Sequence, residues 1–99
     1  MIITKSAPFT KEEIKKLIES LAMDLKRVAL GLQRGSVTMA KRFREEALRR
    51  QEELEAQSLN NYLKKLVINV RKVLISKDER VAEDALMYST LFQNFARKC

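Results

Sequence analysis

Apolar residues recur in steps of three and four along two long stretches of the chain, which is the spacing of one face of an α-helix. The stretches span residues 14–32 and 81–96. The 99 residues include only two glycines and one proline, so few positions favour tight turns. We therefore expect an all-α fold, a single-domain antiparallel bundle of three to four helices over residues 10–98, preceded by a flexible N-terminal arm over residues 1–9.

The first helix is expected to follow Thr10. Thr10 and Glu13 have the spacing of a capping box, in which each side chain accepts a hydrogen bond from the other residue's backbone N–H. The apolar seam that follows consists of Ile14, Ile18, Leu21, Leu25, Val28 and Leu32. Gly35 suits the position just after a helix end, and either Ser36 or Thr38 suits the cap of a second helix.

The apolar face changes direction in the middle of the chain. Up to residue 58 the stripe is thin, and beyond it a stronger stripe is rotated by more than a quarter of a circle. The thin stripe contains Ala40, Ala47, Gln51 and Leu54. One interpretation is a single long helix over residues 36–76, and the other is a break near Asn60. We expect the break, because Glu52 and Glu55 would otherwise lie on the later apolar face.

The last helix is expected to begin after Ser76. Ser76 and Glu79 have the spacing of a second capping box, and Asp78 is an alternative cap. The apolar stripe of this helix contains Val81, Ala85, Leu86, Tyr88, Phe92 and Phe95. This pattern predicts a helix that buries one face against the rest of the bundle.

The segment over residues 41–56 holds five bases and five acids, so its net charge is zero. Bases and acids recur four residues apart, where each pair stabilises an exposed helix by about 0.2–0.5 kcal/mol. The pairs are Lys41–Glu45, Arg42–Glu46, Glu45–Arg49, Glu46–Arg50 and Arg49–Glu53. We expect these arginines to pair with neighbouring acids rather than with phosphates.

The net charge of +7 is concentrated further along, because residues 57–77 include five bases and no acid. Four of them, Lys64, Lys65, Arg71 and Lys72, form a ridge away from the main apolar stripe, with Ile68 and Ile75 among them. Three interpretations remain open. Ile68 and Ile75 belong to the bundle core with the bases at its rim, or they form a partner interface, or the four bases contact phosphates.

Several kinds of chemistry lack their usual residues. The chain has no histidine, and its one cysteine is the last residue, Cys99. An imidazole base, a thiolate zinc site and an intrachain disulfide are therefore ruled out. The chain also lacks a glycine-rich phosphate-binding loop. We expect no catalytic, cofactor-binding or metal-binding residues, and no enzymatic activity.

The remaining features favour association. No stretch approaches the about 20 apolar residues of a membrane span, and the first residues lack the pattern of a signal peptide. We expect a cytoplasmic, non-enzymatic protein that acts by protein–protein contact as a regulator, adaptor or assembly factor and associates as a homodimer or larger homo-oligomer. The alternative is a nucleic-acid-binding or nucleoid-associated factor that uses residues 64–72. We do not expect a membrane-surface role.

Overall fold

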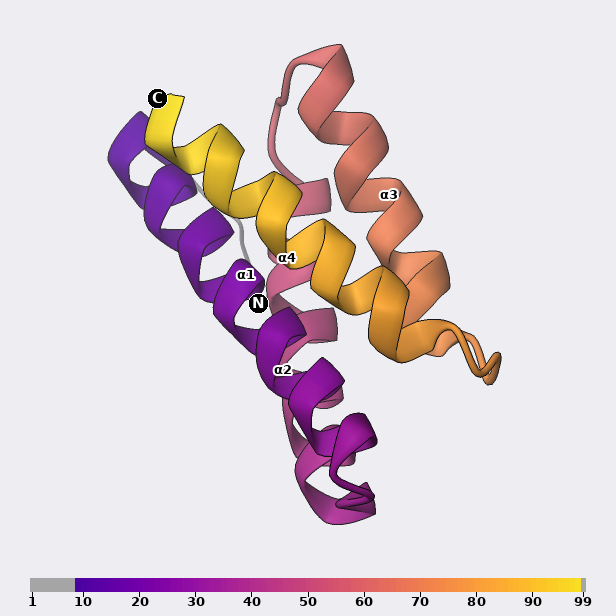
Figure 1. The fold of residues 1–99 in the computed structure, drawn as a ribbon. Coiled ribbons are helices and arrows are strands. Elements are labelled where there is room, and N and C mark those ends of the chain that lie inside the picture. Colours follow the sequence, from indigo (N-terminus) through magenta and orange to yellow (C-terminus); the bar gives the residue numbers. More distant parts are fainter. Residues whose placement is uncertain (1–8, 99) are drawn as a thin grey trace, which may run out of the picture.

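The computed structural model describes residues 9–98 and contains four α-helices joined by short connections (Figure 1). These are α1 (Lys11–Gln33), α2 (Val37–Glu55), α3 (Asn61–Ile75) and α4 (Val81–Lys98). The described residues form no strand, and consecutive helices run in opposite directions (Figure 1). The prediction of an all-α antiparallel bundle is confirmed. Residues 1–8 of the expected arm, and Cys99, lie outside the described residues.

The capping box at the start of α1 is confirmed. The Thr10 hydroxyl oxygen accepts a hydrogen bond from the Glu13 N–H at 3.1 Å, and Glu13 Oε1 accepts one from the Thr10 N–H at 2.8 Å. Two N–H groups at the start of the helix thereby gain partners. The adjacent Phe9 N–H donates to Gln57 Oε1 at 2.9 Å, so the start of α1 is fastened to the connection between α2 and α3.

The turn from α1 to α2 depends on two glycines. Gly35 has φ 73°, in the left-handed region that favours glycine, and the Ser36 N–H donates to the Gly31 carbonyl oxygen at 2.8 Å. Ser36 then caps α2 by accepting the Met39 N–H at 3.3 Å. A Cβ atom at Gly31 would lie 2.8 Å from the backbone nitrogen of Ala40. Glycine therefore lets the backbones of α1 and α2 approach closely.

The expected break in the middle of the chain is also confirmed. Helix α2 ends at Glu55, and α3 begins at Asn61. Asn60 caps α3, since its Oδ1 atom accepts the Leu63 N–H at 2.8 Å. A short amide side chain that bonds the backbone in this way ends one helix and begins another. The alternative of one continuous helix is wrong.

The second expected capping box is wrong. Helix α4 begins at Val81, and Ser76 instead ends α3 with an extended backbone. The Ser76 hydroxyl oxygen accepts the Asp78 N–H at 3.0 Å, and Asp78 Oδ1 accepts the Arg80 N–H at 2.9 Å. These short polar side chains stabilise a turn by bonding the backbone two residues further on, which competes with helix capping.

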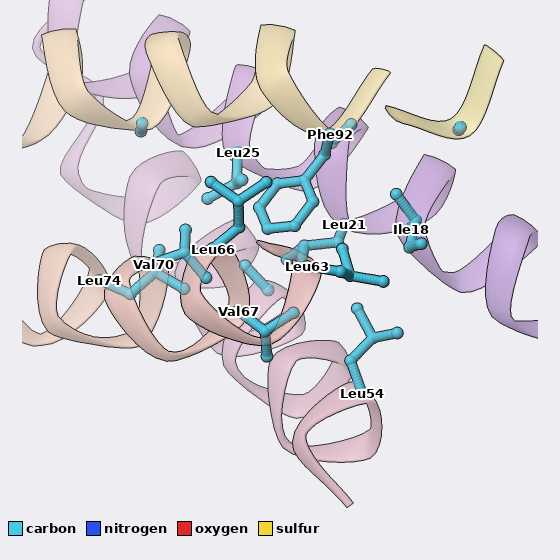
Figure 2. Close-up of a cluster of buried hydrophobic side chains, with 14 of the residues drawn as sticks. Ile18, Leu21, Leu25, Leu54, Leu63, Leu66, Val67, Val70, Leu74 and Phe92 are labelled. Carbon is cyan, nitrogen blue, oxygen red and sulfur yellow. The ribbon is translucent and has the colours of Figure 1, made fainter. Parts of the chain in front are cut away.

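The core lies between the four helices. Helix α1 packs closely along α2 and α4, while α3 packs more loosely against the same two helices from the other side, so α1 and α3 lie across the core from each other. Figure 2 shows the Phe92 ring from α4 among Leu21 and Leu25 of α1 and Leu63 and Leu66 of α3. The largest fully buried side chains are Phe92, Ile18, Leu21, Leu25, Leu54, Leu74, Gln51, Val28, Val67 and Val70.

Candidate interaction surface

The side of α3 that faces away from the bundle combines bases with exposed apolar groups. The core side of the helix buries five residues, which include Leu66 and Val70, against α2 and α4. The remaining positions of the helix must therefore face outwards. Six exposed residues on this outward side form a surface that we call the α3 face: Lys64, Lys65, Ile68, Arg71, Lys72 and Ile75.

The interpretation of Ile68 and Ile75 as core residues is wrong. The exposed fraction is 37% for Ile68 and 62% for Ile75. Their seven-residue spacing places both on one stripe along the helix. Lys64 and Arg71 lie on one side of this stripe, and Lys65 and Lys72 on the other. The α3 face thus has an apolar centre bordered by bases on both sides.

The bases of the α3 face are almost free of acidic partners. Arg71 Nη1 lies 3.9 Å from Glu55 Oε1, and both side chains are more than a third exposed, so this pair is weak. Lys64, Lys65 and Lys72 have no ion-pair partner among residues 9–98. The structure therefore brings together all six predicted site residues on one positively charged surface.

A second exposed apolar surface lies on α4, and the sequence interpretation missed it. Leu86 was expected in the buried stripe, but it is 41% exposed, and Met87 beside it is 49% exposed. That expectation was wrong because Leu86 lies at the edge of the stripe, where the neighbouring helix does not cover it. Glu83, one turn before Met87, is also exposed. The sequence feature that could have marked this side of α4 as exposed is charge, because residues 78–84 carry four acids and one base.

The arginines of residues 41–56 bind fewer neighbours than expected. Arg50 Nη1 lies 3.2 Å from Glu46 Oε1, as predicted, and Arg49 Nη2 lies 2.6 Å from the same oxygen. The other four expected pairs do not form in the described part of the chain. Arg50 Nη1 also lies 2.7 Å from Oδ2 of Asp24 on α1, a contact that the sequence did not indicate. Burial raises the pKa of the Asp24 carboxyl above its ordinary value, and the charge of Arg50 acts in the opposite direction.

Phe43, the aromatic residue that the sequence places among bases, is half-buried and lies beside two arginines. The Arg27 guanidinium lies 5.3 Å from the centre of its ring, and that of Arg42 lies 5.8 Å away. Contacts of this kind are cation–π interactions. With both arginines at the ring, Phe43 is poorly placed to stack on a nucleobase.

A hollow of about 620 Å³ opens between the first half of α1, the start of α3 and the end of α4. Ile18 and Leu63 form its buried floor, and Phe95 lines its wall. Phe95 also stacks on Tyr62, with 6.1 Å between ring centroids. Lys11, Lys16, Glu12 and Glu19 lie at the rim, and no titratable group is buried in it. The apolar part of its lining belongs to the core or packs against it, and the remaining charged and polar side chains are not buried, so the hollow holds no buried set of reactive groups.

The described residues include neither a membrane-spanning helix nor a metal-binding cluster. Within residues 9–98, no helix is both long enough and apolar enough to cross a membrane. The same residues contain no group of three or more acidic or cysteine side chains placed to hold a metal ion. The chain matches no protein-family model, no curated protein and no solved structure at a significant level.

Proposed function

We propose that this is a non-enzymatic protein that acts in the cytoplasm by protein–protein contact, that the contact is made by the α3 face, and that the protein associates with copies of itself. One observation carries the proposal. Ile68 and Ile75 are exposed on one stripe of a helix whose other side is already packed in the core. An apolar centre with a polar border is the usual anatomy of a protein interface.

The core of the bundle does not include Ile68 or Ile75. Each helix already buries an apolar side within the chain. The Phe92 ring, for example, lies among side chains of both α1 and α3 (Figure 2). Exposed isoleucines therefore leave apolar area available for association, which gains about 25 cal/mol per Å² of apolar surface removed from water. Burying both residues against a partner would therefore stabilise the assembly relative to the separate molecules.

The test replaces the apolar centre with charge. The double variant Ile68→Glu, Ile75→Glu should remain helical by circular dichroism, because neither side chain belongs to the buried core. It should also lose self-association, since a partner would then have to bury two carboxylates. Static light scattering at about 100 micromolar protein should give a mass above one chain of 11.5 kDa for the wild type and 11.5 kDa for the variant.

Val37 supplies the matched control. It is an apolar residue at the start of α2, 77% exposed and outside the α3 face. Val37→Glu adds a carboxylate without touching the proposed surface, so this variant should associate like the wild type. A wild type that stays at 11.5 kDa, or a double variant that assembles as well as Val37→Glu, would contradict the proposed function.

Nucleic-acid binding is the second candidate, and the four exposed bases of the α3 face favour it. Phosphate contacts by Lys64, Lys65, Arg71 and Lys72 would make binding fall steeply with salt. Lys65→Glu combined with Lys72→Glu should then abolish a gel shift of duplex DNA or RNA at about 50 mM salt without changing the helical content. We rank this candidate second because the α3 face has an apolar centre and the Phe43 ring is half-buried beside two arginines.

A further inference from the structure

Two α3 faces do not fit each other well. Each carries Lys64, Lys65, Arg71 and Lys72, and three of these four have no acidic partner within residues 9–98. In a two-fold symmetric contact, the same surface of both copies meets, which would bring these bases together at an apolar seam where charge is poorly screened. Like charges placed opposite each other oppose association. A surface that is both apolar and acidic would complement the α3 face better than a second α3 face does.

The chain itself carries such a surface on the outer side of α4. We call it the α4 face and define it by Glu83, Leu86 and Met87 of α4, together with Glu79 in the turn just before the helix, all of which are exposed. Residues 78–87 carry four acids and one base, whereas residues 57–77 carry five bases and no acid; the two bases Arg97 and Lys98 lie at the far end of α4. The two neighbouring segments therefore have opposite charge, and the α3 face and the α4 face each have two exposed apolar side chains.

These two surfaces do not meet within one molecule. Helices α1 and α3 lie across the core from each other, as do α2 and α4. The outward side of α3 therefore points away from α1, and the outward side of α4 points away from α2 (Figure 1). No ion pair joins α3 to α4 among the described residues. A contact between the two faces requires two molecules.

We propose that the α3 face of one molecule binds the α4 face of a second copy, so that the chain assembles head to tail. The inference rests on the proposed function and adds the identity of the partner surface. Ile68 and Ile75 pack against Leu86 and Met87, while the bases bordering the isoleucines face Glu83 and its neighbours. A contact between two different surfaces closes into a ring or continues as a filament, depending on the rotation that relates the copies.

The test uses two variants that each block one face. Ile68→Glu, Ile75→Glu removes the α3 face and leaves the α4 face intact. Leu86→Lys, Met87→Lys removes the α4 face and leaves the α3 face intact. Each variant alone should be a monomer of 11.5 kDa in sedimentation velocity at about 100 micromolar. An equal mixture should form particles of two chains and nothing larger, because both outer faces of that pair are blocked.

The controls and outcomes separate this inference from the proposed function. Val37→Lys should assemble like the wild type, and all variants should retain the wild-type circular dichroism. If Leu86→Lys, Met87→Lys assembles fully, the α4 face is not the partner and the inference fails while the proposed function stands. Monomers in the mixture as well as in each sample would also overturn the inference. A monomeric wild type, or assembly by the α3-blocked variant, would overturn both.

Discussion

Arg50 on α2 and Asp24 on α1 form an ion pair inside the helical hairpin, with 2.7 Å between Nη1 and Oδ2. The Asp24 side chain is 6% exposed and that of Arg50 is 27% exposed, so the acid is the more deeply buried partner. Glu46 lies 3.2 Å from the same arginine nitrogen. Arg50 therefore separates two carboxylates as well as joining two helices.

Arg50→Ala should destabilise the protein more than Asp24→Ala. The first change leaves the buried Asp24 without a partner and close to Glu46, which should cost about 3–5 kcal/mol of unfolding free energy. The second leaves Arg50 partly exposed and still paired with Glu46, so the loss should be smaller. Urea unfolding of both variants measures the difference, and equal losses would contradict a role for Arg50 in separating the two acids.

The pH dependence of stability should reveal the buried carboxyl of Asp24. Burial raises the pKa of Asp24 in the folded state, so the folded protein holds this proton more tightly than the unfolded chain does. The resulting stabilisation is full below the ordinary carboxyl pKa of about 3.9 and is lost as the pH rises through the higher folded value. In Asp24→Asn this contribution is absent.

The checking measurement is the difference in urea midpoint between the wild type and Asp24→Asn, followed from about pH 3 upwards. The wild type should lose stability relative to the variant as the pH rises. A difference that instead grows in favour of the wild type with rising pH would show that the ion pair with Arg50 outweighs burial.

Gln51 should not tolerate its isosteric acid. Gln51 is fully buried, and its Nε2 donates to Glu55 Oε1 at 2.7 Å and to the Val67 carbonyl oxygen at 3.0 Å. In Gln51→Glu, a buried carboxylate would face these two acceptors, which should cost more than about 3 kcal/mol at neutral pH. Its pKa would be raised, so stability should recover as the pH falls towards the ordinary glutamate value of about 4.3.

Gln51→Leu is the matched apolar variant. It has a similar volume and also removes Oε1, a buried oxygen that has no hydrogen-bond partner. The Val67 carbonyl keeps its bond within α3, so thermal unfolding should show a change below about 1.5 kcal/mol. A larger loss for leucine than for glutamate would contradict this description of the site.

Gly31→Ala should destabilise the protein although alanine favours helices by about 1 kcal/mol over glycine. The new Cβ would lie 2.8 Å from the Ala40 backbone nitrogen, so α1 and α2 would have to separate. We expect a net loss of about 1–3 kcal/mol. Thermal unfolding measures it, and an unchanged or increased melting temperature would contradict the close approach.

Gly35 offers a comparison with a different cause. It has φ 73°, and a Cβ atom added there would meet nothing within 4 Å, so Gly35→Ala adds backbone strain of about 1–2 kcal/mol without a steric clash. Asparagine tolerates this conformation better than alanine, and Gly35→Asn should therefore lose less stability. A similar rescue at Gly31 is not expected, because any side chain there meets the backbone of α2.

Local signals in the sequence predicted most of the helix boundaries. Thr10 with Glu13, Gly35, and the short polar side chain of Asn60 act through bonds to nearby backbone, so a few adjacent residues suffice to identify them. The same reasoning failed at Ser76, because a short polar side chain can stabilise a turn as readily as a helix cap.

The sequence did not predict the contacts between helices. Asp24 is one acid beside an apolar seam, and its partner Arg50 is 26 residues away on a helix of unknown rotation. The six residues of the α3 face were identified because that helix has apolar groups on two sides, but the exposed state of Ile68 depends on where α2 and α4 pack. Leu86 was misplaced for the same reason, since the edge of an apolar stripe is covered only if a neighbour reaches it.

We propose that the α3 face holds copies of the protein together. Sedimentation equilibrium of the wild type at about 10 and 100 micromolar tests it most directly, because the mass of a reversible assembly depends on concentration. We predict an average mass above 11.5 kDa that rises with concentration and falls to 11.5 kDa at both concentrations in Ile68→Glu, with helical content unchanged. A wild type that sediments as a single 11.5 kDa species at both concentrations would contradict the claim.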